Sequence, residues 1–337
     1  MKSWLTGPLL GILFLFSACN NQSADKQEPV AILDMEPYTG ITDSISKDAQ
    51  SPALYQRRAE LLVQHGELEL AYKDYLKIWE LAPTEQNAEQ LVNILFMTGK
   101  SEAALSLLKE LLKKYPANEQ FQRRLSEALM NTGEINQAIQ SFDRMIAEDS
   151  ANFEAWFEKG LLLLEQKDTT AAIQHLENSY RLQPLLLTAL TLANIYSETK
   201  NPRTLVLADR IIAKDSAGEM ADPYFIKGIY YVNTGNNAKA LEFFNTCIRM
   251  NWKFQEAYIE KGIIYFDSKN LDEALQQFKL AATVTNTYPE AYYWQGRCYE
   301  ELGMKEEALA NYGRAYSLDR TFKEAVEAAT RVERKTK

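Results

Sequence analysis

Apolar and small residues recur along the chain with a helical period, in pairs of helix-length segments joined by a turn. In the clearest copy, residues 289–319, Tyr292, Gly296 and Tyr299 share one face of a first helix, and Gly303 supplies the turn that follows. The matching positions of the second helix are Ala308, Tyr312 and Ala315. Small residues at such places let two helices approach closely, so the pattern predicts a helical hairpin.

The pattern recurs upstream at an offset of 34 residues, which separates Gly296 from Gly262 and Gly262 from Gly228. Flanking positions follow in both copies: Tyr258, Tyr265, Ala274, Phe278 and Ala281, then Tyr224, Tyr231, Gly235, Ala240, Phe244 and Cys247. Looser copies contain Trp156, Gly160, Ala172 and Leu176; Gly133, Ala138 and Phe142; Gly99, Ala104 and Leu108; and Gly66, Ala71 and Tyr75. Such a repeat predicts stacked hairpins that bury their core between neighbours.

These residues resemble the tetratricopeptide repeat, whose signature is W-x2-L-G-x2-Y, then A-x3-F, with a closing proline. The resemblance implies an all-α, right-handed superhelical solenoid. We place eight repeats at 52–84, 85–118, 119–152, 153–186, 187–220, 221–254, 255–288 and 289–320. A capping helix and basic tail follow at 321–337, with Phe322 and Val326 expected to pack on the eighth repeat. Gln295 and Lys269 depart from the signature, and the fifth repeat fits only after a slip near Asn201.

Residues 1–18 differ in kind from the repeats. Lys2 precedes an apolar run that is too short to span a bilayer, and the run ends at Ser17, Ala18 and Cys19. This segment resembles a bacterial lipoprotein signal peptide, which implies that Cys19 is lipidated and becomes the mature N-terminus. An ordinary secretory peptide followed by an unrelated cysteine is the alternative.

Residues 19–51 are polar and contain Pro29 and Pro37, so we expect the lipidated cysteine to be followed by a flexible tether. Acyl chains would attach the protein to a membrane of the bacterial cell envelope. Asn20, directly after the cysteine, resembles the outer-membrane sorting class. Whether the protein faces the periplasm or the cell exterior stays open.

Charge restricts the choice of partner. The chain has 46 acidic and 37 basic residues and a net charge of −9. Such a surface repels phosphate backbones and anionic lipid headgroups, so no nucleic acid is expected as a partner.

Candidate chemistry is sparse. His65 and His175 lie in different repeats and have no carboxylate or cysteine at metal-ligand spacing. Cys247 and Cys298 occupy small-residue positions in different repeats, which favours free buried thiols over a disulfide. No phosphate-binding glycine loop or nucleophile motif occurs. We therefore expect neither an enzyme nor a cofactor.

The inner side of the first helices is the candidate binding surface, because such arrays commonly bind partners there. It is polar in the first three repeats, where Gln56 and Glu60 also exclude the carboxylate-clamp mode of the family. The predicted binding groove is the apolar inner surface of repeats four to seven, to which repeat eight adds one residue before it turns polar: Phe157, Leu161, Leu164, Phe225, Ile229, Val232, Ile259, Ile263, Phe266 and Tyr293. Nearby acids are Glu154, Glu158, Asp222, Glu256, Glu260 and Asp267. The alternative is that these apolar residues form core.

The sequence therefore predicts a non-catalytic, membrane-anchored scaffold or adaptor. Its partner would be a protein or peptide with apolar anchors and basic flanks. Two alternatives remain open: a structural subunit of an envelope secretion, motility or assembly machine, and a chaperone-like holder of exported proteins. The sequence also leaves open whether the protein forms a homo-oligomer.

Overall fold

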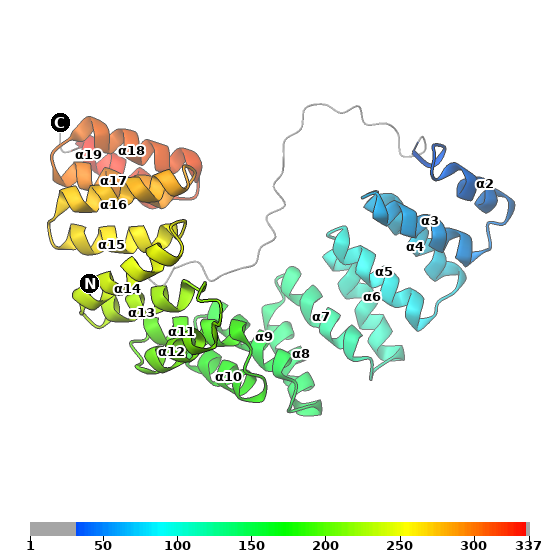
Figure 1. Ribbon diagram of the computed structural model, residues 1–337. Coiled ribbons are helices and arrows are strands. Elements are labelled where there is room, and N and C mark those ends of the chain that lie inside the picture. Colours follow the sequence, from blue (N-terminus) through cyan, green and yellow to red (C-terminus); the bar gives the residue numbers. More distant parts are fainter. Residues whose placement is uncertain (1–31, 335–337) are drawn as a thin grey trace. The chain divides into compact units, whose positions relative to one another are not determined.

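The computed structural model describes residues 32–334, and the regular structure in that range is entirely helical (Figure 1). The predicted signal peptide and Cys19 lie outside the described residues. The chain divides into two compact units, Met1–Glu134 and Ile135–Lys337. The boundary falls in the turn of the third predicted repeat, so each unit is described by itself.

The first unit contains six helices among its described residues. They are α2 (Thr39–Lys47), α3 (Pro52–Gln64), α4 (Leu68–Leu81), α5 (Glu85–Met97), α6 (Ser101–Lys114) and α7 (Glu119–Asn131). Sequence neighbours pack on one another from α2 to α7, as expected for stacked hairpins.

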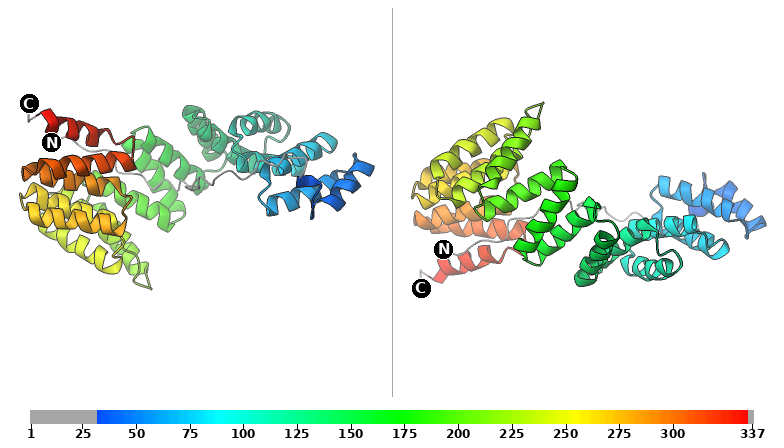
Figure 2. Two further views of the ribbon diagram at one scale, coloured as in Figure 1. Left: turned by 90° about the horizontal axis from the view of Figure 1, so that it is seen from above. Right: turned by 90° about the horizontal axis from the view of Figure 1, so that it is seen from below.

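The second unit continues the alternation of first and second helices. Its helices are α8 (Ile135–Glu148), α9 (Phe153–Glu165), α10 (Thr169–Leu182), α11 (Leu186–Glu198), α12 (Arg203–Lys214), α13 (Asp222–Asn233), α14 (Asn237–Met250), α15 (Gln255–Asp267), α16 (Leu271–Val284), α17 (Pro289–Glu301), α18 (Lys305–Leu318) and α19 (Lys323–Arg334). First helices of adjacent repeats also touch, α11 with α13, α13 with α15, and α15 with α17. The stacked helices can be followed in both views of Figure 2.

In hairpins of the second unit, a glycine in the first helix lets the second helix of the same hairpin approach closely. A Cβ added at Gly228 would lie 2.3 Å from Phe244, and one at Gly262 would lie 2.3 Å from Phe278. Gly296 meets Tyr312 in the same way, at 2.6 Å. The predicted close contact of small and large residues is confirmed, because any side chain at these glycines would displace a buried ring.

The turns between paired helices require a left-handed backbone. Gly303 has φ of +75°, and four other turn glycines are similar. Lysine takes this place in three repeats: Lys167, Lys200 and Lys269 have φ between 58° and 63°. Lys269, which stands in place of the turn glycine of the seventh repeat, therefore adopts the same left-handed backbone conformation.

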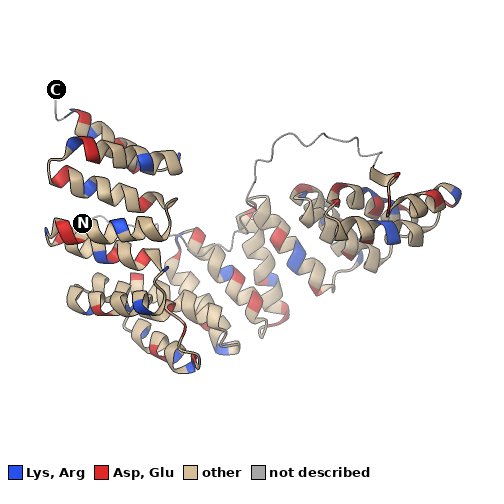
Figure 3. Ribbon diagram, turned by 45° about the horizontal axis from the view of Figure 1, so that its top comes forward, with Lys and Arg blue, Asp and Glu red and all other residues tan. Residues whose placement is uncertain are grey.

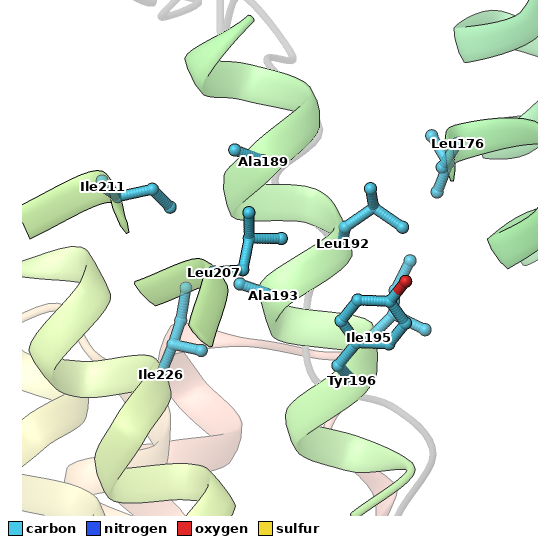
Figure 4. Packing of buried hydrophobic residues seen from close by; sticks show 9 residues of the cluster. All are labelled: Leu176, Ala189, Leu192, Ala193, Ile195, Tyr196, Leu207, Ile211 and Ile226. Atoms are coloured by element: carbon cyan, nitrogen blue, oxygen red, sulfur yellow. The ribbon is translucent and has the colours of Figure 1, made fainter. Parts of the chain in front are cut away.

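The fifth repeat folds as a regular hairpin despite its loose sequence match. Ala193 is fully buried and Leu192 is 1% exposed. Figure 4 shows both within a cluster that joins α10 to α13; its members are Leu176, Ala189, Leu192, Ala193, Ile195, Tyr196, Leu207, Ile211 and Ile226. Alanine in place of glycine suits the smaller aliphatic partners found here.

Two expectations for the ends of the array are corrected. Residues Thr39–Lys47, placed in the flexible tether, form α2, where Ile45 is buried and the preceding Tyr38 is 5% exposed. At the other end, Phe322 packs beside Tyr293, but Val326 is 42% exposed. The capping helix instead buries Ala325, Ala328 and Val332, because its contact stripe is rotated by one residue from the predicted one.

Candidate functional site

We use the name first-helix face for the side of α9, α11, α13, α15 and α17 on which the predicted partner residues lie. None of the ten predicted apolar residues is fully exposed. Four are buried: Ile229 (9%), Ile259 (2%), Phe266 (5%) and Tyr293 (8%). The other six are partly buried: Phe157, Leu161, Leu164, Phe225, Val232 and Ile263. The apolar area available for a partner is therefore smaller than the sequence suggested.

A second periodic set of large residues accounts for this burial. Phe254 precedes α15 and lies 5.0 Å, ring to ring, from Phe225. Phe322 precedes α19 and lies 5.1 Å from Tyr293. Tyr288 precedes α17 and packs in the cluster that contains Ile259. These three aromatic residues are also 34 residues apart, so the signal that they cover part of the first-helix face was present in the sequence.

Phe266 is covered in another way, by α17. Its ring lies 5.6 Å from that of Trp294, which also stacks on Phe278 at 5.6 Å. The guanidinium carbon of Arg297 lies 5.2 Å from the Phe266 ring centre. These contacts join the seventh and eighth repeats and make Phe266 part of the core.

Exposed apolar surface on α11 was missed by the sequence reasoning. Leu185, Leu186 and Leu187, at the start of this helix, are 41%, 44% and 49% exposed. Adjacent exposed leucines form an apolar patch, a feature that often marks an interaction site. The fifth repeat contributed no residue to the predicted face. Its sequence fits the repeat signature only after a slip near Asn201, so the outward-facing residues could not be assigned from the pattern.

Carboxylates from three first helices interact electrostatically. We use the name carboxylate cluster for Glu198 on α11, Glu256 and Glu260 on α15, and Glu290 on α17. Glu260 interacts electrostatically with Glu290 and Glu198, and the Tyr288 hydroxyl interacts with Glu290, Glu256 and Glu260. Tyr288 donates a hydrogen bond of 2.9 Å to Glu290. Figure 3 shows acidic residues on the helices of this unit.

Like charge and burial disfavour ionisation in the carboxylate cluster. Burial, followed by the charges of Glu290 and Glu198, raises the pKa of Glu260 to about 8. Lys261 follows Glu260 in α15, but burial alone lowers its pKa, so an acidic partner does not stabilise its charge. Burial and like charge therefore favour the protonated form of Glu260.

The first helices of the first unit carry polar residues that bond to one another. Arg124 donates to Glu127 at 2.7 Å and to Asn93 at 2.9 Å, and it lies over the Phe96 ring. Gln56 donates to Glu60 at 2.8 Å. This unit thus satisfies many of its own side chains.

Each of the two histidines has a hydrogen-bond partner, and the two described cysteines lie in the core. Tyr38 and the Nδ1 of His65 are 3.0 Å apart, and His175 Nδ1 is 2.8 Å from the Ala171 carbonyl. Cys247 and Cys298 are free and buried, as predicted, and burial raises the pKa of each thiol to about 12. Within residues 32–334, no three His, Cys, Asp or Glu side chains are placed to hold a metal ion.

Four segments of the chain match the family described as tetratricopeptide repeat: residues 95–158, 153–184, 225–289 and 289–322. The chain carries tetratricopeptide repeats. This agrees with the paired helices, the close-approach glycines and the left-handed turns described above. Tetratricopeptide repeats form protein-interaction scaffolds rather than catalytic sites. No curated protein matches the chain as a relative.

The chain is similar to several solved structures. A tetratricopeptide repeat protein from Parabacteroides merdae ATCC 43184 aligns with a TM-score of 0.51 and 16% identity, over 84% of this chain and 99% of that one. Yeast Tom70 aligns with 0.49 and 14%, over 90% and 86%. The APC/C hetero-tetramer Cut9-Hcn1 aligns with 0.48 and 16%, over 88% and 59%. At these identities the likeness concerns the fold alone.

Between residues 32 and 334, no helix combines the length and the apolar character needed to cross a bilayer.

Proposed function

We propose that the protein is a non-catalytic scaffold of the bacterial cell envelope. Acyl chains on Cys19 anchor it in the outer membrane, and the first-helix face of the second unit binds a segment of a partner protein. The lipoprotein-like residues before Cys19 support the anchoring. The partner carries apolar anchors with basic residues on either side.

The observation that carries the binding proposal is the exposed leucine patch on α11. Leu185, Leu186 and Leu187 lie next to one another and are each more than two-fifths exposed. Burial of apolar area drives association, and a few buried anchors usually supply most of the binding energy. Leu161 on α9 and Ile263 on α15 are partly buried residues of first helices in the same unit and can extend this contact.

The test is crosslinking capture from cell envelopes followed by mass spectrometry. The Leu186→Asp, Leu187→Asp double variant is compared with the native protein and with Leu280→Asp. Leu280 is a matched control because it is 40% exposed but lies on a second helix, α16. We expect one partner to be lost from the double variant and retained by the control. Equal recovery from all three proteins would exclude this face as the binding site.

The anchoring is tested separately with Cys19→Ser. Metabolic labelling with a fatty-acid analogue should mark the native protein and not the variant. The variant should also leave the membrane fraction. Unchanged labelling and unchanged fractionation would contradict lipidation at Cys19.

A further inference from the structure

A lysine directly precedes the glycine of the first helix in three repeats of the second unit: Lys159, Lys227 and Lys261. Two of these lysines form ion pairs with an aspartate of the preceding second helix. The Nζ atom of Lys159 lies 2.5 Å from Asp143 of α8, and that of Lys227 lies 2.6 Å from Asp209 of α12. Each of these lysine side chains is 13% exposed, whereas the aspartates are 53% and 62% exposed. A carboxylate at this place therefore neutralises a mostly buried ammonium group from the solvent side.

The third lysine has no such counterion. Asn245 of α14 takes the place of the aspartate, because it directly follows the buried ring of Phe244. Asp143 directly follows the equivalent ring, that of Phe142. Among the described residues, Lys261 takes part in no hydrogen bond or ion pair, and burial lowers its pKa. Its ammonium group is thus partly buried without the balancing charge found at the two equivalent positions.

A buried acceptor at this position is also unsatisfied. In the sixth repeat the ring centre of Phe243 lies 4.5 Å from Lys227 Nζ. Gln277 of α16 holds the place of Phe243 in the seventh repeat, because both residues directly precede the buried ring that packs on the first-helix glycine. Gln277 is 9% exposed, and its Oε1 accepts no hydrogen bond from the residues that the structure describes. The repeat thus places a lysine without a counterion beside an amide oxygen without a donor.

The two occupied positions indicate which ligand fits the third. Both lysines bind a carboxylate through a short, charge-assisted contact, so the same place beside Lys261 fits a carboxylate rather than a cation or an apolar group. The amides of Asn245 and Gln277 can each turn an NH2 group toward an anion. Asn245 is exposed, which leaves the place open to a group from another molecule.

This position lies away from the first-helix face. Lys261 is two residues from both Ile259 and Ile263, and two residues correspond to about 200° of rotation around an α-helix. A ligand at Lys261 therefore contacts the side of α15 opposite to the first-helix face.

We propose that Lys261, Asn245 and Gln277 form a carboxylate-binding site for an acidic side chain of a second protein. The aspartate or glutamate of this partner supplies the counterion that Asp143 and Asp209 supply elsewhere in the unit. The site goes beyond the proposed function, because it takes an acidic ligand and lies on the other side of α15. It gives the scaffold a second contact whose specificity depends on charge.

The first test asks whether the site has the geometry of its two equivalents. Asn245→Asp places the carboxylate in the chain itself and should raise the pKa of Lys261, measured by NMR of isotope-labelled lysine ammonium groups in the full chain. Acetate serves as the probe for a free carboxylate. It should shift the Lys261 signal of the native protein saturably and leave that of Asn245→Asp unchanged. Lys253, an exposed lysine of the same unit, should show no saturable shift.

The second test uses a displayed library of random peptides, selected on the full native protein and on Asn245→Asp. Peptides selected on the native protein should be enriched in aspartate or glutamate, and those selected on Asn245→Asp should not. The peptides are fused through their C-termini, so a free chain end cannot account for the enrichment. Glu242→Gln, which removes an exposed acid of α14, should select like the native protein.

A synthetic copy of the strongest selected peptide gives the quantitative readout. Replacing its acidic residue by the corresponding amide should weaken binding to the native protein by about tenfold or more. The same replacement should have little effect on binding to Asn245→Asp or Lys261→Gln. Fluorescence anisotropy measures binding, after circular dichroism has shown that the variants are folded. The Leu186→Asp, Leu187→Asp variant should bind the peptide like the native protein, so failure of the proposed function would leave this result unchanged.

Three results would overturn the inference. An unchanged pKa of Lys261 in Asn245→Asp would show that the two side chains do not meet. An equal response of Lys261 and Lys253 to acetate would mean that only general screening of charge occurs. Equal acidic enrichment on the native and Asn245→Asp proteins, or none on either, would exclude this position as the binding site.

Discussion

One hairpin of the first unit and two hairpins of the second are closed by different chemistry. In the first unit, Arg58 of α3 and Asp74 of α4 form a buried ion pair with contacts of 2.7 and 2.8 Å, and Arg58 also donates to Thr42 of α2. In the second unit, Phe244 and Phe278 lie against Gly228 and Gly262. The first arrangement depends on the pairing of charges, whereas the second depends on shape.

The first helices of the units differ in the same sense. Arg124 of the first unit is held by Asn93 and Glu127, so its charge is used within the unit. Glu260 of the second unit has no such partner. The charge of Arg124 is therefore balanced within its own unit, whereas burial and like charge disfavour ionisation of Glu260.

The largest expected effect is at the buried ion pair. Asp74→Asn leaves the Arg58 charge buried without its counterion and should lower the free energy of unfolding by about 3 kcal/mol. Hydrogen exchange followed by mass spectrometry should show faster exchange in α3 and α4 and little change in α15 to α18. Glu69→Gln is the control, because its exposed pair with Lys100 should contribute less than about 1 kcal/mol. Equal losses in both variants would remove the contrast between the units.

The converse change is Gly262→Ala in the second unit. The added methyl group would lie 2.3 Å from the Phe278 ring, so we expect a loss of about 2 kcal/mol from overpacking. Urea denaturation measures it. Gly313→Ala is a matched control on α18 of the same unit, where a Cβ meets no atom within 4 Å. That control should gain roughly 0.5–1 kcal/mol from helix propensity. A neutral Gly262→Ala would show that shape does not limit this unit.

The acidic face predicts a characteristic dependence of stability on pH. The pKa of Glu260 is about 8 in the folded chain and near 4.5 in the unfolded chain, so the folded state binds the proton more tightly. Stability should therefore fall as pH rises from about 4.5 to about 8. Glu260→Gln removes this loss and should raise the free energy of unfolding by roughly 2 kcal/mol above pH 8.

Thermal denaturation of native and Glu260→Gln proteins across pH 4–9 provides the measurement. The two curves should meet at the acidic end, because both side chains are neutral there. Glu242→Gln should follow the native curve throughout. A constant difference between native and Glu260→Gln at every pH would mean that the carboxylate carries no penalty in the folded state.

The smallest expected effect is at the turns that carry lysine. Lys200→Gly relieves a left-handed residue with φ of 58° and should stabilise the second unit by roughly 0.5–1 kcal/mol. Lys269→Gly should gain less, because Lys269 also pairs with Glu301 at 3.0 Å and lies over Phe266. A larger gain at Lys269 than at Lys200, measured by thermal denaturation, would contradict this account.

The sequence predicted the fold well because the repeat depends on local contacts. Gly228, Gly262 and Gly296 were assigned to the close approach of two helices, and their neighbours are buried rings. Burial of Cys247 and Cys298 followed from the same alternation of small and large residues. Interactions within one hairpin, or between a hairpin and its neighbour, repeat at a fixed offset and can be read from one chain.

The candidate site was predicted less well, for a physical reason. Ile259 and Tyr293 were placed on the open face, but Tyr288 and Phe322, which precede the next helices α17 and α19, pack near them. The exposure of a side chain on a first helix depends on which side chains near the next first helix pack over it. Those contacts depend on the angle between adjacent repeats. Leu187 was missed because the register of α11 could not be set without its helix ends.

The amino-acid sequence by itself determined the helical hairpins, the close-approach glycines and the excess of acid, since each follows from residue type and spacing. Tertiary structure alone decided which apolar residues stay exposed, that Thr39–Lys47 forms a packed helix, and that Glu198, Glu260 and Glu290 gather from three helices. Burial and charge clustering depend on the distances between elements, and a pattern along one chain does not contain those distances.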